Sequence, residues 1–141
     1  YGLWSQIGHG KYETTKLLSE YLSLLISLDK HAEATETAEE LLELDPENQT
    51  ALDWLAKKHF RQADELYQSE MQAYEENRTH RQYARLLESL EVVNTNLHIA
   101  LDYFKRLYEQ EPATEYASYL ANIYERFQDE ERARYYRNRA Q

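Results

Sequence analysis

The sequence predicts an all-α protein. Its apolar residues recur at intervals of three and four, which is the period of a helix and not the alternation of a strand. The 141 residues include only three Gly and two Pro to interrupt such a pattern, and they include no Cys. A chain of this length buries enough surface for a hydrophobic core without disulfides or a structural metal. We therefore expect one helical domain over residues 1–141.

Breaks in the apolar pattern divide the chain into helices. Asp29-Lys30 separates two periodic segments, and the prolines of Asp45-Pro46 and Glu111-Pro112 forbid continuation of the helices before them. Asp and Asn near these breaks can cap the first turn of the following helix. The expected helices lie near 12–28, 31–44, 49–76, 79–93, 96–110, 114–127 and 129–140. Short connections between them predict antiparallel neighbours.

The helix expected near 49–76 is unusually long. No Gly or Pro occurs between Glu47 and Thr79, and one face stays apolar throughout. A helix of about 26 residues would span roughly 39 Å. We expect it to replace a helix pair and to join two hairpin modules.

A repeat of helix-hairpin length is visible. The segments Leu41 to Pro46 and Leu107 to Pro112 end two equivalent helices, and an alanine stands 12 residues before each proline, at Ala34 and Ala100. This pattern resembles the tetratricopeptide repeat (TPR) family, in which each unit of about 34 residues is a helix pair. The resemblance covers units at 15–48, 81–114 and 114–141. In the unit 81–114 it implies that Ala84 and Leu87 point inward on the first helix and Ala100, Phe104 and Leu107 on the second.

The resemblance also implies an architecture and a binding surface. Antiparallel hairpins of this family stack as a right-handed superhelix, and the first helix of each unit lines its concave groove. Carried over to this sequence, the expected partner-binding residues are Lys57, Arg61, Arg85, Ser89, Asn122 and Arg126. The excess of cations there favours an acidic or mixed peptide as the ligand.

Composition and motifs exclude several functions. The net charge is −10, and residues 33–47 hold seven acidic residues and no basic one, so we expect no nucleic-acid partner. No apolar run is long enough for membrane insertion. The five histidines show no pair at ligand spacing and no HExxH motif, and no glycine-rich phosphate loop occurs. We therefore expect neither metal, cofactor nor catalysis. The acidic residues 33–47 form either a solvated helix face or a docking strip for a basic partner.

These observations favour a non-catalytic scaffold that binds a peptide or protein partner in a groove between helix hairpins. The alternative is a structural subunit that forms homo-oligomers through exposed repeat ends, near Trp4 and Ala140. The chain opens at Tyr1 and ends before the last unit's expected proline. We therefore expect it to be part of a longer protein.

Overall fold

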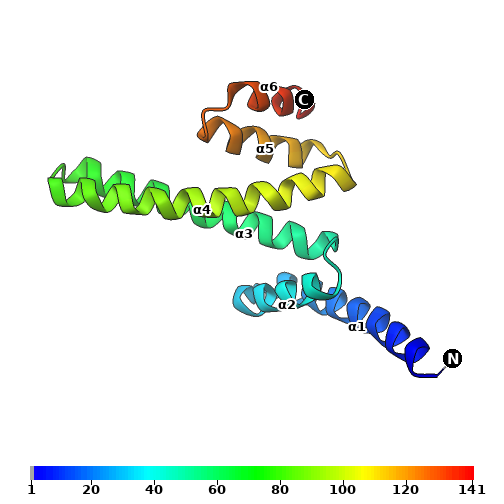
Figure 1. Cartoon of the computed structure of the whole chain (residues 1–141). Helices are drawn as coiled ribbons and strands as arrows, with labels where there is room; N and C mark the ends of the chain where they lie inside the picture. The colour runs from blue at the N-terminus through cyan, green and yellow to red at the C-terminus, as the bar shows by residue number, and fades with distance from the viewer. Residues whose placement is uncertain (1) are drawn as a thin grey trace. The chain divides into compact units, whose positions relative to one another are not determined.

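Six helices and no strand make up residues 2–141 of the computed structural model (Figure 1), which confirms the all-α prediction. The structure describes the backbone of these residues and the side chains of residues 12–141, so Trp4 lies outside the described side chains. Residue contacts divide the chain into two compact units, Tyr1–Leu55 and Ala56–Gln141.

The first unit is built on an antiparallel helix pair. Helix α1 spans Gly2–Ser27 and helix α2 spans His31–Leu44. The two helices pack through fully buried small and aliphatic side chains. Those side chains are Leu22, Leu25, Ala34, Ala38 and Leu41. Helix α1 begins ten residues before the predicted start, because glycine lowers helix propensity by only about 1 kcal/mol and does not forbid a helix.

Both short helix pairs of the chain turn in the same way. After α1, Asp29 adopts a left-handed conformation with φ 58°, and the amide of Lys30 donates to the carbonyl of Leu25 over 3.0 Å. After α5, Gln128 has φ 61°, and the amide of Asp129 donates to the carbonyl of Tyr124. This is the Schellman ending of a helix, formed here without the usual glycine.

The third helix, α3, spans Gln49–Glu76 and confirms the predicted long helix at its predicted bounds. Its first turn is capped by Asn48, whose side-chain oxygen accepts from the amide of Ala51 over 3.0 Å. Before it, Pro46 follows the C-cap residue Asp45 of α2, as the sequence predicts. The boundary between the two units falls within α3, so its residues from Ala56 onward belong to the second unit.

In the second unit, α3 and α4 form a long antiparallel hairpin. Helix α4 spans His80–Gln110, and Thr79 caps it by accepting from the amide of Gln82 over 3.1 Å. Polar contacts join the hairpin at two levels. His59 Nδ1 lies 2.7 Å from Asn96 Oδ1, and the Arg85 guanidinium lies 3.4 Å from the buried Glu70 carboxylate.

The break expected between residues 93 and 96 is wrong, because α4 continues through it. Asn94 and Thr95 are weak helix formers, but neither lacks the amide that the helix needs. Thr95 donates its hydroxyl proton back to the carbonyl of Glu91, and buried Val93 and Leu97 hold the segment against its neighbours.

The inward positions expected for Ala84 and Leu87 are also wrong. Both residues are exposed, since the first half of α4 does not form the first helix of a pair. The second half of the expectation is right: Ala100, Phe104 and Leu107 are all fully buried. Residues 81–110 thus contribute one continuous helix rather than a hairpin.

The last two helices form a second short pair. Helix α5 spans Thr114–Arg126 and helix α6 spans Glu130–Arg139, close to the predicted bounds. Ala133 is fully buried where the two helices pack, and the rings of Tyr124 and Tyr136 stack between them at 5.7 Å. On its other side α5 packs against α4, where the rings of Phe104 and Tyr119 stack at 4.4 Å. Within residues 2–141, no helix has the length and apolar character that a membrane span requires.

The continuity of α4 predicts the effect of a proline at its centre. Thr95→Pro removes one helical hydrogen bond and clashes with the carbonyl of residue 91, so it should lower the free energy of unfolding by about 3 kcal/mol or more. Thr95→Ala, the matched control, should leave stability unchanged or slightly raised. Urea unfolding followed by circular dichroism measures both. Equal midpoints for the two variants would mean that the helix does break here.

The capping of α6 predicts a titration. Asp129 Oδ2 accepts from the Arg132 guanidinium at 2.7 Å and Oδ1 accepts from the Arg132 amide, and these two hydrogen bonds hold the pKa of Asp129 below its ordinary value. The stabilisation from this cap should therefore be complete above about pH 4, the pKa of an unfolded Asp, and be lost as the pH falls through the lower folded pKa.

Carboxyl carbon chemical shifts followed against pH would measure this pKa. Arg132→Gln removes the charged partner and keeps the backbone amide, so it should move the midpoint part of the way back. A midpoint at the ordinary value in the unmodified protein would contradict the described cap.

Candidate functional site

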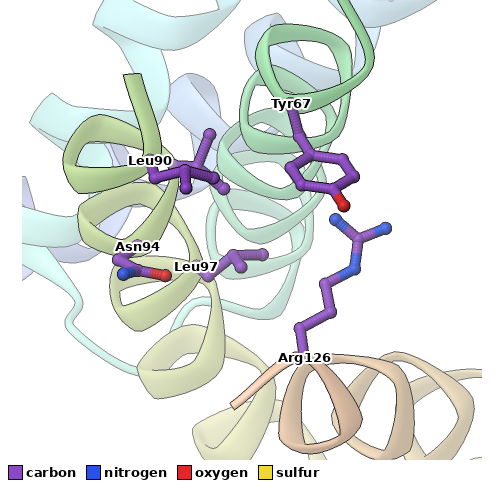
Figure 2. A pocket seen from close by; sticks show the side chains of 6 residues that line it. Tyr67, Leu90, Asn94, Leu97 and Arg126 are labelled. Carbon is purple, nitrogen blue, oxygen red and sulfur yellow. The ribbon is translucent and has the colours of Figure 1, made fainter. Parts of the chain in front are cut away.

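A pocket of about 300 Å³ lies in the second unit between α3, α4 and α5 (Figure 2). One residue of α3, four of α4 and one of α5 line it. They are Tyr67, Leu90, Val93, Asn94, Leu97 and Arg126. The pocket therefore depends on the α3–α4 hairpin and on the position of α5 against α4.

The α4 side of the pocket is mainly aliphatic. Leu90, Val93 and Leu97 follow one another at intervals of three and four residues, so they share one face of the helix. Val93 and Leu97 are almost completely buried, whereas Leu90 is half-buried. This face continues the row of buried residues that packs the rest of α4, so it forms a rigid apolar wall.

Three polar side chains complete the pocket. Tyr67 comes from α3, Asn94 from α4 and Arg126 from α5. Figure 2 shows the guanidinium of Arg126 and the hydroxyl of Tyr67 pointing toward each other across from the α4 wall. A phenol, an amide and a guanidinium all carry hydrogen-bond donors. The site thus combines an apolar wall with donors for a negatively polarised group.

The Arg126 side chain is held in place by its neighbours. Its Nε donates to Asn122 Oδ1 at 2.9 Å, and one terminal nitrogen lies 2.5 Å from Asp64 Oδ1. The guanidinium also lies over the ring of Phe60, 5.2 Å from its centre. A planar guanidinium fixed on several sides keeps one orientation, so a ligand need not order it.

Asn122 and Arg126 are the two predicted site residues that the structure brings together at this pocket. Lys57 lies further toward the start of α3 and pairs with Glu115 of α5 over 2.7 Å. Arg61 is exposed on α3. An excess of cations had been expected here, but carboxylates from neighbouring helices neutralise Lys57 and Arg126.

The other two predicted residues lie on α4. Arg85 extends over the hairpin to Glu70, whose side chain is 10% exposed, and Ser89 is half-buried about one turn further along. Neither residue lines the pocket. Their assignment to a groove depended on a helix pair within 81–114, and α4 is a single helix.

Four pocket residues were not expected to form a site: Tyr67, Leu90, Asn94 and Leu97. The sequence does carry a signal for the apolar ones, since Leu90 and Leu97 stand at heptad spacing in α4. Nothing comparable marks Tyr67 or Asn94. Their position follows from the register of α3 against α4, which a 34-residue repeat does not predict.

Among the described side chains, no group of three His, Cys, Asp or Glu residues is placed to hold a metal ion. No protein-family model matches the chain, and no curated protein matches it. The chemistry of the pocket residues themselves is therefore the basis for a functional proposal.

The ion pair that fixes Arg126 has a measurable energy. Both side chains are about 30% exposed, so solvent screens the pair, and a double-mutant cycle with Asp64→Ala and Arg126→Ala should give a coupling of about 0.2–1 kcal/mol. The coupling should decrease in 1 M NaCl, because the Debye length there falls to about 3 Å. Urea unfolding of the four proteins measures it. Zero coupling at low salt would contradict the described geometry.

Proposed function

We propose that the chain is a non-catalytic protein-interaction module that binds a peptide segment of a partner at the pocket between Tyr67 and Arg126. The observation that carries this proposal is the combination of a rigid apolar wall with oriented donors in one concavity. Pockets that bind ligands usually have this composition, because apolar area supplies affinity and a few polar groups fix orientation.

The contacts of Arg126 suggest the chemistry of the ligand. Its Nε and one terminal nitrogen are used by Asn122 and Asp64, which leaves the second terminal nitrogen for an acceptor. Tyr67 and Asn94 add a phenol and an amide on the same pocket. A peptide would place an aliphatic or aromatic side chain against Leu90 and present a carbonyl or carboxylate oxygen to the donors.

The TPR assignment is part of the proposal, and the buried positions support it. In each helix pair, alanine and large apolar residues are buried at matching places. These residues are Leu22, Leu25, Ala34 and Leu41 in the first pair, Leu55, Ala56, Ala100 and Leu107 in the second, and Leu120, Ala121, Tyr124 and Ala133 in the third. Helix pairs with small residues at the crossing are typical of this family.

In this proposal the middle unit is enlarged. The start of α3 is its first helix, and the end of α4 is its second helix. The remaining parts, the end of α3 and the start of α4, form a hairpin that extends beyond an ordinary repeat. Such an extension accounts for the 66 residues between Pro46 and Pro112. It also accounts for the pocket, because Tyr67, Leu90 and Asn94 all belong to the added segment. The right-handed superhelix stays a prediction.

Filling the pocket tests the proposed function. Peptides would be selected from a random display library on the unmodified chain, and their affinities would be measured by isothermal titration calorimetry. Leu90→Trp places a large ring in the pocket and should weaken binding at least tenfold, since it removes the space for the ligand side chain. Leu87→Trp is the matched control, because Leu87 is exposed on the same helix and does not line the pocket.

The control should retain the affinity of the unmodified chain. Circular dichroism and urea midpoints should agree for the three proteins, so that loss of binding does not reflect loss of the fold. Selected peptides that bind Leu90→Trp as tightly as Leu87→Trp would contradict the proposal, and so would a failure to select any peptide.

A further inference from the structure

Helix α1 carries an exposed apolar stripe. It consists of Leu17, Tyr21, Leu24 and Leu28, which follow each other at intervals of four, three and four residues and therefore share one face. The first three lie on α1, and Leu28 is the residue that follows the helix. Their exposed fractions are 66, 48, 53 and 56%. Single large apolar residues are often exposed on protein surfaces, but a continuous row of four is typical of an interaction surface.

The equivalent stripe of α5 shows what such a surface packs against. Tyr116, Leu120, Ile123 and Phe127 have the same four, three, four spacing and stand at the same distances from the Schellman turn. The first three are buried, and α5 packs on α4. Phe127 stacks on His98 of α4 at 4.4 Å. In α5 this stripe is thus covered by a helix, and no described residue covers its counterpart on α1.

Acidic residues border the α1 stripe. Leu22 and Leu25 form the face of α1 that packs on α2, and the stripe is rotated from that face by about 100° around the helix axis. Glu33 and Glu40 are rotated by a similar angle from the face of α2 that packs on α1. Because the two helices are antiparallel, both rotations point to the same side of the pair, so these glutamates lie beside the stripe. The opposite flank of α2 carries Thr35, whose hydroxyl accepts from the Trp54 indole over 3.2 Å.

Charge in the first unit is strongly one-sided. Residues 1–55 hold 11 acidic and 3 basic residues, a net of −8. The glutamates of α2 are all exposed, and their neighbours in the sequence from 33 to 47 include no basic residue. A partner with Lys or Arg beside its apolar face would therefore be attracted to this surface, and a partner with acidic flanks would be repelled.

We propose that the α1 stripe and the Glu33 and Glu40 flank together bind a basic amphipathic helix of a partner protein. The helix would lay apolar residues spaced by three and four on the stripe, in the way that α4 covers α5, and would place Lys or Arg beside the glutamates. This surface has no residue in common with the Tyr67 and Arg126 pocket, so it is a second site.

A second copy of the chain fits this surface less well. The equivalent of α4 at the end of the chain is α6, whose exposed residues are mostly polar, with Glu131, Arg134 and Asn138 among them. Tyr135 is an exposed aromatic residue of α6, but the Arg139 guanidinium lies over its ring at 3.5 Å. Pairing of two α1 stripes would bring together two units of −8 each, which electrostatic repulsion opposes.

Designed peptides test the proposal. The probe is a 21-residue helix with Leu at positions a and d of three heptads and Lys at e and g. One control peptide has Glu in place of Lys, and another has the probe's composition in an order without heptad spacing. Fluorescence anisotropy should show binding of the probe that is at least tenfold tighter than that of either control, and the binding should weaken as salt increases. Equal binding of the probe and the shuffled peptide would overturn the proposal.

Variants locate the binding surface. Leu17→Ser with Leu24→Ser should reduce affinity for the probe at least tenfold, whereas Leu87→Ser with Val92→Ser, two exposed apolar residues of α4, should not. Glu33→Lys with Glu40→Lys should likewise reduce it, and Glu65→Lys with Glu75→Lys on α3 should have a much smaller effect. All these positions are exposed, so the fold should be retained.

The outcomes separate the proposed occupant from the others and this site from the pocket. Leu90→Trp should leave probe binding unchanged, so a failure of the pocket proposal would not affect this one. Equal losses in Glu33→Lys with Glu40→Lys and in Glu65→Lys with Glu75→Lys would show attraction by net charge alone and would overturn the proposal. Equal losses in the two serine variants would show that the probe does not bind at the α1 stripe and would overturn it as well. Analytical sedimentation of the chain without peptide tests for a second copy at this surface. A dimer of the unmodified chain that is absent in Leu17→Ser with Leu24→Ser would also overturn the proposal.

Discussion

The second unit depends on one row of residues along α4 that packs against two helices at once. The row keeps intervals of three and four over most of the helix and consists of Leu86, Leu90, Val93, Leu97, Ala100, Phe104 and Leu107. At its C-terminal end Phe104 is fully buried and stacks on Tyr119 of α5. At its centre the same row becomes the wall of the pocket. Continuity of α4 is therefore what connects packing to the candidate binding site.

Much of the fold could be predicted because its signals are local. Helical periodicity, prolines after α2 and α4, and the absence of breakers from Glu47 to Thr79 identify most helix boundaries correctly. The error between residues 93 and 96 arose because the repeat resemblance implies a helix pair within 81–114, and such a pair needs a turn there. Asn94 and Thr95 at this point are weak helix formers. Burial of Val93 and Leu97 outweighs a propensity difference of a few tenths of a kcal/mol per residue.

Much less of the candidate site could be predicted, because it depends on contacts between distant segments. The repeat pattern selects Arg126, which lines the pocket, and Asn122, which accepts a hydrogen bond from it, and both predictions depend only on positions within one helix. It could not reveal that Asp64 and Glu115 neutralise Arg126 and Lys57, since ion pairs between helices depend on their register.

The central claim is that the pocket beside Arg126 binds a peptide. Amide chemical-shift changes in the 15N-labelled chain, titrated with a peptide selected on it, would test this claim most directly. The account predicts saturable shifts centred on Tyr67, Leu90, Asn94 and Arg126, with little change in α6. Shifts confined to α6, or to the first unit, would contradict it.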